Sequence, residues 1–198
     1  MKRRKAVRRR RFLAFGAVAA LIGVFVAAVI VSGLFDHALK ELTLPLRHED
    51  VIRQQAEEKQ VDAALIAAVI YSESKFSDQT SSAGARGLMQ ITPEAADTIA
   101  KNSNATTFEL KDLGDPEINI RYGTFLLAEF LDRYDGDEVA ALAAYNAGPG
   151  NADKWGGAEL TVEEIPFPET RAYVEEVLEK RDEYRREYAT ELGYGGIP

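Results

Sequence analysis

Residues 12–35 contain no charged side chain, and most of them are apolar. At about 1.5 Å per residue, a helix of this length covers the roughly 30 Å hydrocarbon core of a bilayer. A buried helix of a globular protein rarely runs this far without a polar residue, so we expect residues 12–35 to form a transmembrane signal-anchor. The alternative is a cleaved signal peptide, since small residues lie near Ser32 and Gly33, but the apolar region of such peptides is usually only about 7–15 residues long.

A strongly basic segment precedes this apolar stretch. Eight of the 24 basic residues of the chain lie within residues 1–11. Positive charge beside a membrane span favours the cytoplasmic side, so residues 1–11 are expected to form a basic cytoplasmic head. Everything after the span would then lie outside the cytoplasm.

The rest of the chain is acidic and poor in several chemically versatile residues. All 32 acidic residues follow residue 35, where they outnumber the basic residues two to one. Such a body repels a phosphate backbone, so no nucleic-acid partner is expected. The chain has no cysteine, and its two histidines, His37 and His48, precede the main periodic region. Disulfides, a zinc site and a Ser/His/Asp triad are therefore not expected, which leaves carboxylate chemistry.

Beyond the membrane segment, the sequence predicts one mainly α domain. Residues 36–45 are interpreted as a stalk, because their leucines follow no clean helical period and Pro45 interrupts the chain. The domain is placed at residues 46–188. It is expected to be mainly α, because no segment there shows the alternation of apolar and polar residues that is typical of a strand. Residues 189–198, rich in glycine, are expected to form a flexible tail.

Several helix start signals lie within the predicted domain. Acidic N-caps or prolines at the first helical position mark these starts at Asp62, Pro93, Pro116 and Asp137. In the helix after Pro116, the candidate core residues are Ile118, Phe125, Leu126 and Phe130. In the last helix, residues at near-helical spacing are Tyr173, Val177, Tyr184 and Tyr188.

Glu73 ends an otherwise apolar helical run. It lies at i+3 from Ile70, i+4 from Val69 and i+7 from Ile66, which places it on the buried stripe near the helix C-terminus. Burial and the negative end of the helix dipole both raise the pKa of a carboxyl group. A carboxylic acid that stays protonated near neutral pH can donate to a leaving oxygen, as glycosidic bond cleavage requires. A purely structural glutamate that crosslinks the next loop is the alternative.

Two further segments carry polar groups at chain turns. Gly84 and Gly87 allow a tight turn and a close approach to a ligand, and Gln90 follows with an amide that both donates and accepts. Tyr145 and Asn146 lie at a helix end before glycine and proline residues. Taken singly, these could be a solvated amide and a half-buried tyrosine.

Together, these segments resemble a known family, the soluble lytic murein transglycosylases, whose lysozyme-like fold is related to that of goose-type lysozyme. The matching segments run in the family's order over the whole predicted domain; they are "AAVIYSESKF", "SSAGARGLMQITPEAA", "ALAAYNAGPGNADKW" and "EIPFPETRAYVEEVL". The resemblance implies an enzyme that acts on peptidoglycan glycan strands. With the anchor predicted above, its catalytic domain would lie on the cell-wall side of the membrane, or the protein would be secreted if the anchor is cleaved.

The resemblance also assigns roles to individual residues. It makes Glu73 the single catalytic acid and then base. It implies that the glycan-binding cleft is lined by Ser74, Ser81, Met89, Gln90, Tyr145 and Asn146. From the last motif it places Glu163 or Glu164 near the cleft, with Tyr173 in support.

The family cleaves the β-1,4 bond between N-acetylmuramic acid and N-acetylglucosamine without water, and the sugar's own 6-hydroxyl forms a 1,6-anhydro end. Such chemistry needs one carboxyl group, whereas a conventional glycosidase needs two. No metal or cofactor is implied; Asp132, Asp135 and Asp137 lack the spacing of a calcium loop and are interpreted as turn and cap residues. The alternatives are a lysozyme-type hydrolase, with Asp78 as second acid, and a non-catalytic glycan-binding module of the envelope.

Overall fold

The structure is a computed structural model that describes residues 38–102 and 109–195. The predicted basic head and transmembrane signal-anchor, residues 1–35, lie outside these residues. Within the described part, no helix is long and apolar enough to cross a bilayer. The chain divides into two units at Leu44, and the second, Pro45–Pro198, contains the predicted domain. In the first, residues 38–43 are helical, although the leucine spacing there gave no clean helical period.

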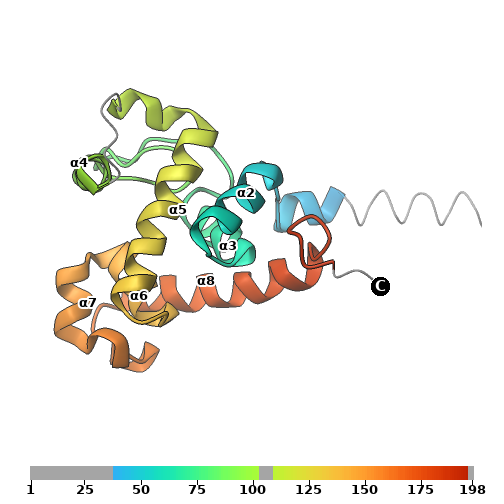
Figure 1. Cartoon of the computed structure of the whole chain (residues 1–198). Coiled ribbons are helices and arrows are strands. Elements are labelled where there is room, and N and C mark those ends of the chain that lie inside the picture. Colours follow the sequence, from blue (N-terminus) through green and yellow to red (C-terminus); the bar gives the residue numbers. More distant parts are fainter. Residues whose placement is uncertain (1–37, 103–108, 196–198) are drawn as a thin grey trace, which may run out of the picture. The chain divides into compact units, whose positions relative to one another are not determined.

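The second unit is built from helices, which confirms the prediction of a mainly α fold. Figure 1 shows the long α8 running along one side of the unit and α5 crossing from α4 towards α6. The described strand pairing consists of two isolated bridges, between Thr80 and Arg86 and between Arg86 and Ile91. The α-helices are α2 (Glu49–Lys59), α3 (Ala63–Ser74), α4 (Pro93–Asn102), α5 (Pro116–Arg133), α6 (Glu138–Ala147), α7 (Pro149–Trp155) and α8 (Pro168–Glu187), and the 3-10 helices are η1 (Leu110–Gly114), η2 (Gly157–Glu159) and η3 (Val162–Glu164).

Helix α3 is the centre of the core. Its residues from Ala63 to Ile70 are all buried, and it packs most extensively against α8 (Figure 1). The side chain of Asp62 accepts a hydrogen bond from the backbone N–H of Ala64, which caps the helix as predicted. Lys75 ends the helix in the left-handed region, with φ of 51°. Glu73 therefore occupies the last turn of a helix that is buried on every side along its first two turns.

The other predicted helix starts are confirmed. Asp115 caps α5, with Pro116 at its first position, and Asp137 caps α6 through the backbone N–H of Ala140. Pro93 begins α4. A proline at the first position costs no hydrogen bond, because that N–H has no partner inside the helix.

The predicted core face of α5 was wrong by about one residue. Its buried positions are Asn119, Ile120, Gly123, Thr124 and Leu127, whereas the four apolar residues chosen from the sequence are only half-buried. The buried face is polar and small because α5 packs closely against the loop that contains Met89: a Cβ added to Gly123 would lie 2.3 Å from the Met89 sulfur.

Residues 189–195, predicted as part of a flexible tail, make defined contacts instead. Leu192 is buried, and the Tyr194 hydroxyl accepts a hydrogen bond of 2.8 Å from the backbone N–H of Ala64 while donating to Asp62. Arg185 of α8 also pairs with Asp62. The C-terminal turns therefore cover the start of α3, an arrangement that depends on a contact across 132 residues of sequence.

Candidate active site

Glu73 lies at the point where α3, α6 and α8 meet. Burial raises the pKa of its carboxyl from 4.5 to about 7, and an interaction with the Tyr173 hydroxyl partly opposes this rise. The ionised form of Glu73 raises in turn the pKa of both Tyr145 and Tyr173, so the three groups lie close together. No other carboxyl group in the described part of the chain contributes to the shift of Glu73.

Tyr173, on the first turns of α8, lies close to Glu73. Its hydroxyl oxygen is buried, and no group among the described residues reaches it with good hydrogen-bond geometry. Its electrostatic interaction with Glu73 shows that the carboxyl is the nearest candidate partner. A buried hydroxyl without a hydrogen bond costs free energy. The Tyr173 hydroxyl is therefore available to form a hydrogen bond with the neighbouring carboxyl.

Tyr145, at the end of α6, connects Glu73 with the loop that follows α3. Its hydroxyl donates a hydrogen bond of 2.9 Å to the backbone carbonyl of Met89, and its ring packs edge-on against Phe130 of α5, at 6.4 Å between centroids. Burial is the main cause of its raised pKa, followed by the charge of Glu73. The tyrosine therefore stays neutral near pH 7 and fixes one side of the site.

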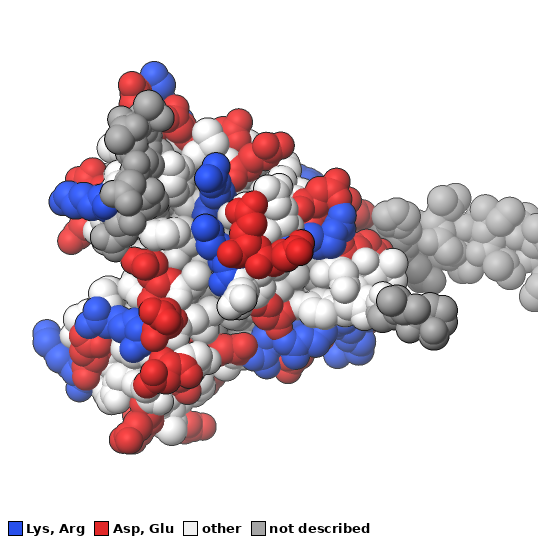
Figure 2. All heavy atoms as spheres, viewed as in Figure 1, with Lys and Arg blue, Asp and Glu red and all other residues white. Residues whose placement is uncertain are grey.

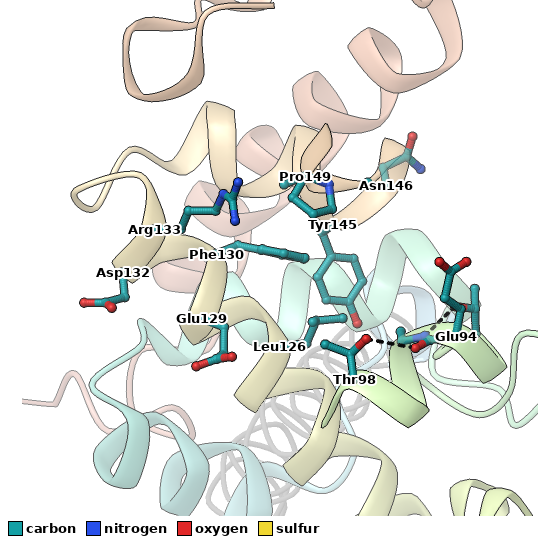
Figure 3. Close-up of a pocket in the computed structure, with 14 residues that line it drawn as sticks. Glu94, Thr98, Leu126, Glu129, Phe130, Asp132, Arg133, Tyr145, Asn146 and Pro149 are labelled. Carbon is teal, nitrogen blue, oxygen red and sulfur yellow. Dashed lines mark hydrogen bonds between the residues drawn. The ribbon is translucent and has the colours of Figure 1, made fainter. Parts of the chain in front are cut away.

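A cavity of ≈ 500 Å³ is lined in part by Tyr145, whereas Glu73 and Tyr173 are not among its lining residues. It lies between α4, α5 and the junction of α6 and α7, and in Figure 2 this edge of the molecule is hollowed. Figure 3 shows Tyr145 among Phe130, Leu126 and Thr98, while the side chains of Glu129 and Asp132 lie farther from the tyrosine. Ala144, Asn146, Gly148 and Pro149 complete that wall. An aromatic and polar surface of this kind suits a sugar ring.

Asn119 of α5 holds the loop that contacts Tyr145, a role that the sequence analysis missed. Its Oδ1 accepts from the backbone N–H of Met89 at 2.8 Å, and its Nδ2 donates to the carbonyls of Arg86 and Leu113, both at 2.9 Å. The side chain is fully buried. One signal in the sequence could have indicated this role. Asn119 lies four residues after Asp115, the predicted helix cap, and therefore on the same face of the helix.

Gly87 is the residue that lets the loop approach Asn119. Its φ is +74°, and a Cβ placed there would lie 2.1 Å from Asn119 Nδ2 and 2.5 Å from the Leu113 carbonyl oxygen. Both facts exclude a side chain at this position. The prediction of a tight turn and close backbone approach at this glycine is confirmed, although the approach is to Asn119.

Most of the other residues chosen from the sequence use their polar groups within the protein. Ser74 is buried and donates to the carbonyl of Ile70, and Ser81 accepts from the backbone N–H of Ala85. The Gln90 amide donates to the carbonyls of Gln79 and Gly87. Met89 is fully buried. These four shape the loop beside Tyr145, and none of them lines the cavity.

Asn146 lies at the cavity, whereas Glu163 and Glu164, the acidic pair of the last motif, lie outside it. Asn146 lines the cavity, and its Oδ1 accepts from the hydroxyl of Thr170, a second residue that the sequence analysis missed. Glu164 caps η3 through Thr161, which lowers the pKa of Glu164. Glu163 is exposed on η3. Neither glutamate lines the cavity.

No group of three or more His, Cys, Asp or Glu side chains within residues 38–102 and 109–195 is arranged to hold a metal ion. Asp132 lines the cavity, Asp137 is the cap of α6, and Asp135 lies in the turn between α5 and α6 with φ of 54°.

Comparison with known proteins identifies the family of this site. The sequence profile described as Transglycosylase SLT domain matches residues 50–167. The chain belongs to this family. All but two of the candidate residues fall within the matched SLT region; the exceptions are Thr170 and Tyr173, both on α8.

Relatives of this SLT chain include soluble and membrane-bound proteins. The soluble lytic murein transglycosylase of Escherichia coli strain K12 is 35% identical over 169 residues, which cover 81% of this chain and 26% of that protein. The membrane-bound lytic murein transglycosylase F of Pseudomonas fluorescens strain Pf0-1 is 29% identical over 161 residues, which cover 77% of this chain and 31% of that protein. The chain thus spans about a quarter of the length of the soluble relative.

Solved structures agree with this membership. The 70 kDa soluble lytic transglycosylase of Escherichia coli superimposes with a TM-score of 0.70 at 34% identity, covering 81% of this chain and 27% of that one. An inactive Glu-to-Gln mutant of the lytic transglycosylase Slt from Pseudomonas aeruginosa gives a TM-score of 0.71 at 30% identity, covering 76% and 26%. The helical arrangement around Glu73 is therefore that of the SLT fold.

Replacing Asn119 by aspartate should destabilise the SLT domain by about 2 kcal/mol, because the change keeps the acceptor for Met89 but removes both donors, each worth about 1 kcal/mol. Urea unfolding checks this. The matched control is Asn151→Asp. The Asn151 amide donates one hydrogen bond, to the Ala147 carbonyl, so this substitution should destabilise the domain by about half as much. Equal losses in the two variants would show that Asn119 does not anchor the loop.

Proposed function

We propose that this protein is a membrane-anchored lytic transglycosylase, which cleaves the β-1,4 bond between N-acetylmuramic acid and N-acetylglucosamine of peptidoglycan and leaves 1,6-anhydro ends. One observation carries the proposal: Glu73 is a carboxyl group with a pKa of about 7, beside two tyrosines, and no other carboxyl group in the described residues shifts that pKa. A single acid suits a reaction in which the substrate supplies its own nucleophile.

In the first step, protonated Glu73 donates its proton to the glycosidic oxygen as the bond to the muramic C1 breaks. The N-acetyl group of the muramic residue stabilises the positive charge that develops at C1. Near neutral pH, a pKa of about 7 leaves a large fraction of Glu73 protonated and yet leaves its conjugate base strong enough for the second step. Tyr145 and Tyr173 lie beside the carboxyl, and burial is the main cause of its raised pKa.

In the second step, the Glu73 carboxylate takes the proton of the muramic 6-hydroxyl as O6 bonds to C1. The acid is thereby regenerated, and no water is consumed. A hydrolase would need a second carboxyl about 5–9.5 Å from the first. Asp78, the candidate for that role, is exposed in the loop after α3 and does not contribute to the pKa shift of Glu73.

The relatives support this assignment. Those aligned here are lytic murein transglycosylases, and one solved relative is an inactive mutant in which a glutamate is replaced by glutamine. A further solved relative is a complex with bulgecin A, so the fold accommodates a small ligand. We assign the corresponding catalytic role in this chain to Glu73, and glycan contacts to Tyr145, Asn146 and the loop around Met89.

We also propose that residues 12–35 anchor the protein in the cell membrane, with residues 46–188 as the catalytic domain on the cell-wall side. The apolar stretch and the basic residues before it support this, and membrane-bound proteins are among the relatives. Cell fractionation tests the anchor. The full chain is expected in the membrane fraction and should resist extraction by high salt, and its recovery in the soluble fraction would overturn the proposal.

Mass spectrometry of the products tests the reaction. The full chain in detergent should release muropeptides that are one water lighter than hydrolysis products, and Glu73→Gln should release them about 10³-fold more slowly. Muropeptides with hydrated ends would identify a lysozyme-type hydrolase, and an absence of products would favour a glycan-binding module.

The hydroxyl of Tyr145 should matter more for turnover than for stability. Tyr145→Phe removes one hydrogen bond, to the Met89 carbonyl, which is worth about 1 kcal/mol of stability. It also releases the loop from the ring beside Glu73, so we expect kcat to fall about tenfold or more, by analogy with the loss of one positioned polar group. Steady-state assays and thermal unfolding check this. Unchanged kcat would reduce Tyr145 to a packing residue.

A further inference from the structure

A second hollow lies between α2 and the start of α5, away from Tyr145 and its cavity. It has a volume of ≈ 340 Å³, and none of its lining residues lines the cavity beside Tyr145. Its apolar lining consists of the half-buried Val51 and Ile118. Its polar lining consists of Gln54, Gln55, Glu58, Glu117 and Arg121. We call this hollow the α2–α5 groove.

Two glutamines fix one carboxylate at this groove. The Gln54 amide donates to one oxygen of Glu58 at 2.8 Å, and the Gln55 amide donates to the other at 3.0 Å. These hydrogen bonds lower the pKa of Glu58, which is therefore ionised. Both amide N–H groups face Glu58, so the network offers hydrogen-bond acceptors to anything that enters the groove.

Gln55 leaves one of these acceptors unused. The side chain is 3% exposed, and its Oε1 has no hydrogen-bond partner among the described residues. A buried amide oxygen without a partner is uncommon in a folded protein and calls for a group that donates to it. Gln55 lines the groove, so this unsatisfied amide lies in its wall.

Arg121 brings the opposite charge to the same groove. It is exposed, and its guanidinium acts electrostatically on Glu58 across the groove. A guanidinium binds a carboxylate through two parallel hydrogen bonds. The groove therefore presents a carboxylate binder on α5 and, facing it on α2, a fixed carboxylate with an unused amide oxygen.

We propose that the α2–α5 groove binds the zwitterionic end of a short peptide, with its carboxylate on Arg121 and its ammonium group on Glu58, beside Gln55. A neutral sugar has no charged group to pair with Arg121 or with Glu58, whereas a zwitterion has one for each. This assignment rests on the proposed function for the origin of the ligand, since the stem peptides of peptidoglycan carry both ammonium and carboxylate groups. The groove would hold the peptide part of the wall while the cavity beside Tyr145 holds the glycan.

Nuclear magnetic resonance of the full-length Glu73→Gln chain in detergent tests the groove without any cleavage. The probe is the dipeptide L-lysyl-D-alanine, which has two ammonium groups and one carboxylate. We expect it to shift the side-chain amide signals of Gln55 and the Nε–H signal of Arg121. Two capped probes, one with an amidated carboxylate and one with both amines acetylated, should bind at least about tenfold more weakly, as expected when one charged hydrogen-bonding group is lost.

A charge-matched pair of variants locates the binding. In the Glu73→Gln background, Arg121→Gln should weaken the dipeptide by about tenfold or more, whereas Lys154→Gln, which removes an exposed charge on α7, should not. Equal affinity in both variants, or a full dipeptide without effect on Gln55 and Arg121, would overturn the proposal. So would shifts of these signals by N-acetylglucosamine but not by the dipeptide. These results do not depend on cleavage, so they remain separate from a failure of the proposed function.

Discussion

Glu73→Gln should lower the rate of peptidoglycan cleavage by about 10³-fold, within the range typical of a positioned general acid or base. The glutamine side chain keeps the size of the glutamate but can neither donate a proton to the leaving oxygen nor accept one from the 6-hydroxyl. Both steps depend on the same group, because no other carboxyl in the described residues acts on Glu73. Product release from purified peptidoglycan, followed by chromatography, measures the loss.

Two controls make this result specific. The Glu73→Gln variant should keep the helical circular dichroism of the wild type and still bind glycan strands, because the amide fills the same space. Asp78→Asn changes an exposed acid in the loop after α3 and should leave the rate unchanged. If the Asp78 variant lost activity as well, two acids would be needed and the enzyme would be a hydrolase.

The second large effect is on stability, and its sign follows from the raised pKa of Glu73. In the unfolded chain the carboxyl titrates near 4.5, whereas in the folded protein burial raises its pKa to about 7. Between these values the folded state holds a proton that the unfolded state has released, so stability falls as pH rises from 4.5 to 7 and does not change further above 7 through this group. At 1.36 kcal/mol per pKa unit, the total is about 3 kcal/mol.

The Glu73→Gln variant provides the reference, because its amide does not titrate. The free energy of unfolding of the variant minus that of the wild type should therefore grow by about 3 kcal/mol between pH 4.5 and pH 8. Urea denaturation at several pH values measures this difference. A difference that stays constant with pH would mean that Glu73 is as well solvated in the folded protein as in the unfolded chain.

Local rules were enough to predict how the helices begin, but not the burial of Glu73. Asp62, Asp115 and Asp137 cap their helices, because a short side chain before an apolar run has few other ways to satisfy the first free N–H groups. Helical spacing placed Glu73 in line with Ile66, Val69 and Ile70, but α3 is buried on all sides from Ala63 to Ile70, so what packs around its last turn decides the burial of Glu73.

Long-range contacts explain what could not be predicted. The buried face of α5 carries Asn119 because a loop 30 residues earlier needs its hydrogen bonds, and hydrophobic periodicity contains no sign of that need. Tyr194 is ordered by Asp62, far away in sequence. The polar groups of Gln90 and Ser81 looked available for a ligand, but backbone groups of their own loop occupy them.

The same reasoning separates the residues that act on the substrate from those that support them. Tyr145 connects both groups, because its hydroxyl binds the Met89 carbonyl while its ring lines the cavity (Figure 3). Asn119, Gly87 and Gln90 act one step farther away, by holding the loop that carries Met89. Substitutions in this second set should therefore reduce stability and turnover together.

The central claim is that one carboxyl group, Glu73, performs both proton transfers because the fold holds its pKa near neutrality. A carbon-13 NMR titration of the Glu73 carboxyl, assigned by its absence in Glu73→Gln, tests this most directly. The account predicts a midpoint of about 7. A midpoint near 4.5, the ordinary value for a glutamate, would show that Glu73 is a solvated carboxylate at neutral pH and would contradict its role as the acid.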